Sequence, residues 1–202
     1  ETNILGTLNL PDVLIKENIN PTKVLIASSA AVYGNIGNEL SEDMWPKPVN
    51  HYGNSKLAME HMVSNYFDKL NIIITRPFNY TGSGQEEHFL VPKIVSHFKK
   101  YAQEIALGNL YTLREYNDVN FVSECYLALL ESSFHSDVVN VCSGITHSIQ
   151  EIIDTLEKIS GHSIETNVDE RFVRKNEILE LKGDNKKLNS IIGNEVIKPS
   201  LE

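Results

Sequence analysis

Three short apolar runs along the chain are typical of buried strands. The first is Val24-Leu25-Ile26-Ala27, the second covers residues 71–77 and contains three consecutive isoleucines, and the third covers residues 138–144 and ends in a turn. All three are short and rich in β-branched side chains, which favours strand over helix. Because the first run shows no alternation of apolar and polar residues, it predicts a strand of a buried parallel sheet.

Between and after these runs, apolar residues return at helical spacing. A helix is expected over residues 52–70, and its apolar positions are typical of a helix that faces a core or a dimer partner. These positions are Leu57, Met59, Met62, Val63 and Phe67. Further helices are predicted over residues 89–95, 123–132 and 149–159. For the last of these, Ser148 is the expected N-cap and Gly161 the expected stop.

Composition and charge narrow the class of protein. The chain has 202 residues, of which 41% are hydrophobic and 22% charged, so it is long enough to bury a core in one or two domains. A net charge of −9 argues against nucleic-acid and anionic-membrane partners. An anionic ligand would therefore depend on a few local Arg and Lys side chains. The sequence contains no run of about 18 apolar residues and no signal-peptide pattern.

Cysteine and histidine usage adds two expectations. Cys125 and Cys142 form no disulfide framework and no metal-ligand spacing, which fits core positions in a protein of the reducing cytoplasm. The seven histidines are scattered along the chain, so no metal site is expected.

The candidate chemistry lies in a tyrosine and a lysine four residues apart. Tyr52 and Lys56 share one face of the expected helix, where the ammonium can favour the phenolate of a tyrosine whose ordinary pKa is about 10. Ser29 follows the first apolar run, at the strand end where open α/β sheets bind their ligands. Its hydroxyl could hydrogen-bond the same reacting oxygen as Tyr52. The three residues are therefore candidates for proton transfer.

An ordered set of motifs extends this pattern. Ser29 stands four residues before Tyr33, the pair Tyr52 and Lys56 follows, and then comes Arg76-Pro77-Phe78-Asn79 with a Thr-Gly-x-Gly-Gln segment after it. In this order the chain resembles the extended short-chain dehydrogenase/reductase family of NAD-dependent epimerases and dehydratases. Within the family it is most similar to the branch of GDP-4-keto-6-deoxymannose reductase and GDP-mannose 4,6-dehydratase.

The resemblance covers nearly the whole chain and implies an α/β fold. Residues 1–80 would form the second half of an NAD(P)-binding Rossmann-like domain, a parallel sheet that carries the catalytic set. Residues 81–202 would mainly form a small α/β part that binds a nucleotide sugar, with some segments returning to the sheet. The chain opens on a helical pattern similar to the family's central helix, so the Gly-rich fingerprint is expected upstream, within roughly three βαβ units of about 30 residues each.

The resemblance also implies roles for individual residues. Ser29, Tyr52 and Lys56 would be catalytic, and Ser28, Pro77 and Asn3, together with Tyr52 and Lys56, would lie beside the dinucleotide, either NAD or NADP. The choice between these two cofactors is expected to lie in the upstream part.

A nucleotide-diphospho sugar is the substrate that the resemblance implies. Asn79 would contact the sugar nucleotide, Lys93, Arg114 and Arg174 would hold the diphosphate, and Glu177 would contact the nucleoside. The alternative for these positions is that they bind no ligand. A lysine in a helix is usually solvated, and a Gly-rich turn need not bind anything. In the segment 174–177 a lysine replaces the family's proline, which changes the rigidity expected of that loop.

The residues between Ser29 and Tyr33 favour one reaction over others. Family dehydratases carry acidic residues there, whereas this chain has Ala30 and Ala31. Without a carboxylate, β-elimination lacks its general acid and base, so dehydration is disfavoured. Reduction of a 4-keto-6-deoxy nucleotide sugar needs only the Tyr, Lys and Ser together with a nicotinamide, and it is the reaction that we expect. Epimerisation at C4 and 4,6-dehydration are the alternatives in the same family. A non-catalytic fragment that binds nucleotide sugar and dimerises is the alternative of another class, and the helix over residues 52–70 is the expected homodimer contact.

Overall fold

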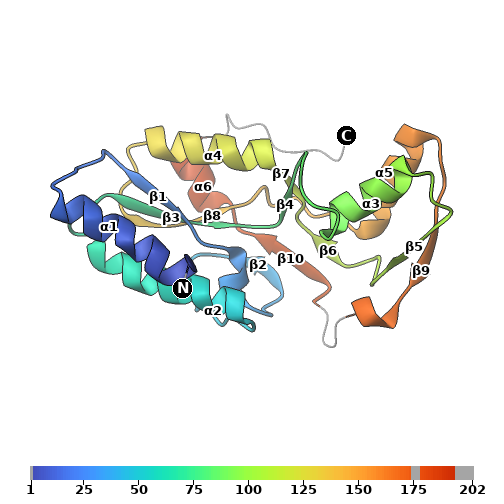
Figure 1. The fold of residues 1–202 in the computed structure, drawn as a ribbon, viewed down its shortest axis with the longest axis horizontal. Coiled ribbons are helices and arrows are strands. Elements are labelled where there is room, and N and C mark those ends of the chain that lie inside the picture. Colours follow the sequence, from blue (N-terminus) through green and yellow to red (C-terminus); the bar gives the residue numbers. More distant parts are fainter. Residues whose placement is uncertain (1, 174–177, 194–202) are drawn as a thin grey trace.

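The structure is a computed structural model that describes residues 2–173 and 178–193. Figure 1 shows two parts, a sheet with helices on both faces and a smaller group of helices and strands beyond the end of that sheet. The predicted α/β fold with a parallel sheet is therefore confirmed.

The larger part is built around a three-stranded parallel sheet in the order β1-β3-β8. Ile74 of the central strand pairs with Ile26 on one side and with Val138 on the other. Every residue of this central strand is buried, which explains why it begins with three consecutive isoleucines. The bounds are Val24–Ala27 for β1, Ile72–Pro77 for β3 and Asp137–Val141 for β8.

Helices cover both faces of this sheet (Figure 1). Successive side chains of a strand point to opposite faces, so Ile72 and Ile74 join the core beneath α1 and α2, whereas Ile73 joins the core beneath α4 and α6. The bounds are Thr7–Lys16 for α1, His51–Val63 for α2, Val119–Glu131 for α4 and Lys186–Ile192 for α6. A π-helical turn, Thr2–Gly6, precedes α1.

The smaller part has its own apolar core between two helices and a two-stranded parallel sheet. Its elements are α3 (Leu90–Lys99), β5 (Glu104–Leu107), α5 (Ile149–Ser160) and β9 (Glu165–Val168). Ser148 caps α5 in a reciprocal capping box with Glu151, and Gly161 ends the helix in the left-handed conformation, as predicted.

Short parallel strands join the two parts (Figure 1). One set has the order β2-β10-β6, and a second pairs β4 with β7. The bounds are Asn38–Leu40 for β2, Tyr80–Thr81 for β4, Leu113–Arg114 for β6, Asn117–Asp118 for β7 and Glu180–Gly183 for β10. The described residues also form three 3-10 turns: η2 (Ala30–Tyr33), η3 (Ser64–Tyr66) and η4 (Glu170–Phe172).

Three predicted helices differ in their bounds. The helix expected over residues 89–95 is α3, which runs on to Lys99. The helix expected over residues 52–70 ends at Val63 and continues only as η3, because the chain must turn at the buried Leu70 to start β3. The helix expected over 123–132 begins at Val119, because Asp118 Oδ1 accepts a 2.6 Å hydrogen bond from Asn120 N and so caps the helix earlier.

The two cysteines are core residues, as predicted. Cys125 and Cys142 are 0% and 1% exposed. Burial raises the pKa of the Cys125 thiol to about 12 and raises that of Cys142 well above its ordinary value. Over the residues that the structure describes, no helix combines the length and the apolar character needed to cross a bilayer.

Candidate active site

The candidate catalytic residues meet where β1 ends. Ser28 and Ser29 follow β1 directly, and α2 packs against the turn η2 that comes next. Gly53 makes this packing close, because a Cβ at that position would lie 2.5 Å from the carbonyl oxygen of Ala31. Asn50 starts α2 by accepting a 2.8 Å hydrogen bond from Gly53 N. The first turn of α2, which carries Tyr52, is therefore held against the residues after Ser29.

Tyr52 and Lys56 lie beside each other as their spacing predicts. Lys56 Nζ is 5.9 Å from the centroid of the Tyr52 ring and donates a 2.8 Å hydrogen bond to the carbonyl oxygen of Ala27, the last residue of β1. Burial lowers the pKa of Lys56, while the charge of Glu60 acts in the opposite direction. Tyr52 is 50% exposed, so a ligand can reach it. A cation beside an accessible phenol is the arrangement that acid-base chemistry requires.

The two serines differ in their hydrogen bonding. Ser29 Oγ accepts a 3.1 Å hydrogen bond from Ala31 N and so caps η2. Ser28 is buried, and its hydroxyl has no hydrogen-bond partner in the described part of the chain. Buried hydroxyl groups normally have a partner, so the Ser28 hydroxyl leaves a hydrogen-bonding position open at the end of β1.

Asn3 is attached to the same helix turn. Its Nδ2 donates a 3.1 Å hydrogen bond to Ser55 Oγ, which in turn donates to the carbonyl oxygen of Tyr52 over 2.8 Å. The contact joins the start of the described chain to the turn of α2 between Tyr52 and Lys56.

Two further predicted residues lie at the end of β3. Pro77 is the last residue of that strand and is buried. Asn79 is exposed, and its carbonyl oxygen accepts hydrogen bonds from Asn117 N at 2.9 Å and Asn117 Nδ2 at 3.2 Å. Because β1 and β3 are parallel neighbours, Asn79 follows the same edge of the sheet as Ser29.

The other predicted substrate residues come from separate elements. Lys93 lies on α3 in the smaller part, where its Nζ donates to the carbonyl oxygen of Ala106 over 2.7 Å and lies 4.5 Å from the Phe172 ring centroid. Arg114 lies at the junction of the two parts, and its Nη2 donates to the carbonyl oxygen of Ile178 over 2.7 Å. Both cations thus bond to main-chain carbonyl groups. Arg174 and Glu177 lie outside the described residues.

A buried ion pair behind the site was not foreseen from the sequence. Arg76 Nη2 lies 2.6 Å from Glu60 Oε2, and both side chains are almost fully buried. Arg76 Nη1 also donates a 3.0 Å hydrogen bond to the hydroxyl of Tyr33. The available signal was a charged residue, Arg76, within an otherwise apolar strand.

A second buried carboxylate, Glu115, was also missed. It is 0% exposed, and it accepts hydrogen bonds from the main-chain N–H groups of Ser143 at 2.9 Å and Gly183 at 2.6 Å, and from Asn117 Nδ2 at 3.0 Å. Burial raises its pKa, and these hydrogen bonds oppose that effect. Glu115 follows Arg114 directly, so it fixes the main chain next to a residue that is predicted to bind the diphosphate.

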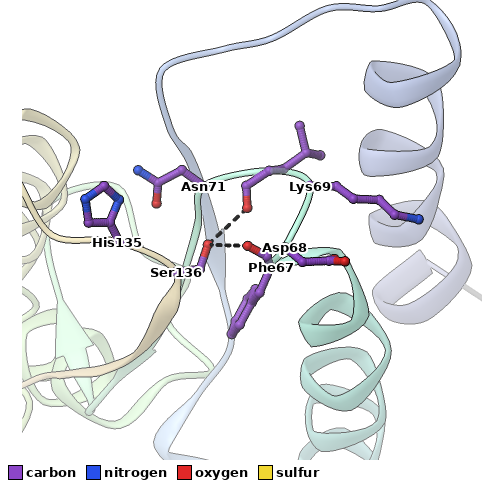
Figure 2. Close-up of a pocket in the computed structure, with 7 residues that line it drawn as sticks. Phe67, Asp68, Lys69, Asn71, His135 and Ser136 are labelled. Carbon is purple, nitrogen blue, oxygen red and sulfur yellow. Dashed lines mark hydrogen bonds between the residues drawn. The ribbon is translucent and has the colours of Figure 1, made fainter.

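The structure also has a surface hollow that is not part of this site. Figure 2 shows residues 67–71 lining it together with His135 and Ser136. The hollow has a volume of about 540 Å³ and lies where β3 and β8 begin, at the edge opposite to Ser29. Ser136 Oγ spans it with hydrogen bonds to the carbonyl oxygens of Phe67 and Leu70. Residues 2–173 and 178–193 contain no cluster of three or more His, Cys, Asp or Glu side chains suited to a metal ion.

Comparison with known proteins gives the family. Residues 1–196 match the family model described as GDP-mannose 4,6 dehydratase. The chain is 40% identical over 194 residues to GDP-6-deoxy-D-talose 4-dehydrogenase of Aggregatibacter actinomycetemcomitans, a match that covers 96% of this chain and 66% of the relative. It is 30% identical over 203 residues to GDP-6-deoxy-D-mannose reductase of Pseudomonas aeruginosa, again covering 96% of this chain and 66% of the relative.

A solved structure agrees with these matches. The structure of RMD from Pseudomonas aeruginosa complexed with NADPH superposes with a TM-score of 0.89 at 29% identity, covering 98% of this chain and 69% of that one. The Rossmann-like fold expected from the motifs is therefore confirmed. This chain spans about two thirds of the length of the curated relatives it matches, 66% in both cases. By sequence and by fold, the chain belongs to the GDP-mannose 4,6 dehydratase family of NAD-dependent epimerases, dehydratases and reductases.

Proposed function

We propose that the complete protein is an NAD(P)-dependent oxidoreductase that reduces the 4-keto group of a 4-keto-6-deoxy nucleotide sugar, most closely a GDP sugar. The observation that carries the proposal is the position of Lys56 Nζ, beside the Tyr52 ring and bonded to the end of β1. The names of the two relatives, a GDP-6-deoxy-D-talose 4-dehydrogenase and a GDP-6-deoxy-D-mannose reductase, support the same chemistry at C4.

Tyr52 is the proposed proton donor. When the carbonyl carbon at C4 is reduced, its oxygen gains negative charge and needs a proton, which the accessible Tyr52 hydroxyl supplies. Lys56 stabilises the phenolate that remains, because a nearby ammonium favours the ionised form of a phenol. Ser29 hydrogen-bonds the same oxygen. Within the described residues, the Ser29 hydroxyl makes one hydrogen bond, which it accepts from Ala31 N. Its own proton can therefore be donated to a substrate.

The residues around β1 fit the nicotinamide end of a dinucleotide. The open hydrogen-bonding position at Ser28, the ammonium of Lys56 and the buried Pro77 all lie at the strand ends where this fold binds its cofactors. Lys56 would hold the nicotinamide ribose, and Asn3 would keep its helix turn in place through Ser55. A bound nicotinamide cofactor supplies the hydride. NAD and NADP both remain candidates.

A nucleotide-diphospho sugar is the proposed substrate. Asn79, exposed after β3, would contact the sugar nucleotide, and Lys93, Arg114 and Arg174 would bind the diphosphate, with Glu177 at the nucleoside. Lys93 and Arg114 bond to main-chain carbonyl groups, so each would have to share or exchange a donor when the diphosphate binds. A planar guanidinium suits this role because it presents five donors.

The turn η2 favours reduction over elimination. It begins with Ala30 and Ala31, directly after Ser29, and neither can act as an acid or base. The next carboxylates along the chain after Ser29 are Glu39 and Glu42. Of these, Glu42 already accepts a 2.7 Å hydrogen bond at its Oε1 from Asn140 N on β8. 4,6-Dehydration is therefore the lesser candidate, and epimerisation at C4, which needs no carboxylate at this position, stays the alternative to reduction.

We further propose a homodimer that pairs through α1 and α2. These helices expose apolar side chains away from the sheet, with Leu10, Val13 and Met62 at 46%, 50% and 42% exposure. Large exposed apolar side chains gathered on neighbouring helices are typical of protein interfaces. Light scattering of the complete protein tests the dimer, and a monomer mass would contradict it.

A cytoplasmic location is also part of the proposal. The two buried cysteines are reduced, which fits a protein of the cytoplasm.

A ligand screen followed by an assay tests the function. The complete protein is expected to gain thermal stability with one of NAD(H) or NADP(H) and with a GDP sugar more than with UDP, dTDP or CDP sugars, because ligands that bind only the folded state raise its melting temperature. Reduction of a GDP-4-keto-6-deoxy sugar is then followed by the fall in absorbance of the reduced cofactor. Stabilisation by a dinucleotide without turnover of any 4-keto sugar would contradict the proposal.

A further inference from the structure

A buried ion pair lies one helical turn beyond Lys56. Glu60 is four residues after Lys56 on α2, so the two side chains share a face of the helix. Arg76, near the end of β3, binds Glu60 through two atoms, with Nε 3.0 Å from Oε1 and Nη2 2.6 Å from Oε2. The side chains of Arg76 and Glu60 are only 6% and 5% exposed. An ion pair so removed from water interacts strongly with its neighbours.

The same guanidinium reaches the turn that carries the candidate serine. Arg76 Nη1 donates a 3.0 Å hydrogen bond to the Tyr33 hydroxyl, and the guanidinium lies 4.8 Å from the centroid of the Tyr33 ring. Tyr33 is the last residue of η2, whose N-cap is Ser29. Its hydroxyl donates onward to Asn140 Oδ1 over 2.8 Å. Arg76 therefore connects the helix of Tyr52 and Lys56 with the turn of Ser29.

We propose that Arg76 is a positioning residue for the candidate catalytic set, acting through Glu60 on Lys56 and through Tyr33 on Ser29. Its contacts fix α2 and η2 relative to each other and to β3. Its charge compensates the Glu60 carboxylate, which otherwise acts uncompensated on Lys56. The inference rests on the proposed roles of Tyr52 and Lys56.

The titratable groups around the ion pair come from α2, from η2 and from the segment after β2. Lys56 is one turn away on α2, and Glu60 opposes the lowering of its pKa by burial. Burial raises the pKa of Tyr33 on η2 to about 12, so Tyr33 is neutral at physiological pH. Glu42, after β2, accepts a hydrogen bond from Asn140 N, and its charge acts on Tyr33.

Opposite changes in charge give the inference a specific signature. In Arg76→Gln a lone carboxylate opposes loss of a proton from the neighbouring pair of Tyr52 and Lys56, so the pair should titrate at higher pH. In Glu60→Gln a lone guanidinium favours that loss, so the apparent pKa falls. Each shift is expected to be on the order of 1 pH unit, the size that Coulomb's law gives for charges roughly 10 Å apart at an effective dielectric constant near 20. The double variant Glu60→Gln/Arg76→Gln carries neither charge and should titrate like wild type.

The experiment is an NMR titration of the complete protein labelled at tyrosine Cζ with carbon-13. The Tyr52 resonance is assigned by its absence from Tyr52→Phe, among the eight tyrosines of this chain and any upstream. Glu87→Gln is the matched control, because it removes a carboxylate from an exposed ion pair with Lys100 and should not move the Tyr52 titration. Shifts of opposite sign in the two single variants support the inference, and equal or absent shifts in folded variants overturn it.

Turnover provides the second readout and covers a failure to fold. If neither single variant folds, a folded double variant should still lose at least about tenfold in kcat with little change in KM, because the link between α2 and η2 is weakened. Wild-type kcat in that folded double variant would overturn the inference. The NMR titration needs no substrate, so it remains decisive even if the proposed reduction of a GDP sugar proves wrong.

Discussion

The fully buried carboxylate of Glu115 accepts a 2.6 Å hydrogen bond from the main-chain N–H of Gly183, which lies in β10. Its other oxygen accepts from Ser143 N at 2.9 Å, in the turn after β8. One side chain thus joins the end of the main sheet to the strands that lead into the smaller part. Glu115 directly follows Arg114, which we propose to bind the substrate.

Replacing Glu115 by Gln should destabilise the protein. The amide NH₂ of glutamine would face main-chain N–H donors in place of an acceptor, and leaving buried donors unsatisfied costs about 1–3 kcal/mol. Urea unfolding at pH 7 measures the loss. Glu165→Gln is the matched control, because Glu165 is exposed on β9. Equal stability of the two variants would show that the Glu115 carboxylate does not hold these segments.

The same residue predicts a pH dependence of stability. Burial raises the folded-state pKa of Glu115 above its unfolded value, ordinarily about 4.3. A raised pKa means that the folded state binds the proton of Glu115 more tightly than the unfolded state does. The stability gained from this proton is complete below the unfolded-state pKa and is lost as pH rises through the folded-state pKa. The free energy of unfolding of the wild type should therefore fall over this window relative to Glu115→Gln. Parallel stability curves for the two proteins would contradict the raised pKa.

Tyr52→Phe should abolish most of the turnover. Removing the hydroxyl takes away the proposed proton donor but leaves the ring beside Lys56, so kcat should fall at least about 100-fold while the affinity for the nucleotide sugar stays nearly the same. Steady-state kinetics and calorimetry on the complete protein measure the two quantities. Tyr101→Phe, a change at an exposed tyrosine between α3 and β5, is the control. Near wild-type turnover of Tyr52→Phe would remove Tyr52 from the mechanism.

Gly53→Ala tests the packing of α2 on η2. The new methyl group would meet the carbonyl oxygen of Ala31 at 2.5 Å, so the first turn of α2 must shift away from the turn that begins at Ser29. A small displacement of catalytic groups is costly, and we expect kcat to fall at least about tenfold. Gly6→Ala is the control, since a methyl group there would meet no atom within 4 Å apart from its own neighbouring backbone. If both variants turn over at the same rate, the contact with Ala31 does not position Tyr52.

The buried cysteines should resist alkylation in the folded protein. Burial raises the pKa of Cys125 to about 12, and the pKa of Cys142 is also raised, so both remain thiols at pH 8 and lie out of reach of a reagent. Incubation with iodoacetamide should leave both residues unmodified by mass spectrometry until urea unfolds the chain. Rapid modification of either residue in the folded protein would contradict the burial described here.

Sequence by itself determined the elements and the local spacing. Short runs rich in apolar and β-branched residues gave β1, β3 and β8, because a parallel strand covered by helices on both faces buries most of its side chains. The four-residue spacing of Tyr52 and Lys56 placed them on one helix face, and Ser148 with Gly161 marked the ends of α5, since capping depends on neighbouring residues alone. The order of the motifs was enough to predict the family.

Only the tertiary structure decided which distant residues meet. The ion pair of Glu60 with Arg76 joins a helix to a strand, and the bond from Glu115 to Gly183 joins residues far apart in the chain. Neither follows from local pattern, because a buried charge is stable only beside a partner that the fold brings to it. The hydrogen bonds of Lys93 and Arg114 to main-chain carbonyl groups could not be predicted from the sequence either. They depend on how the smaller part packs.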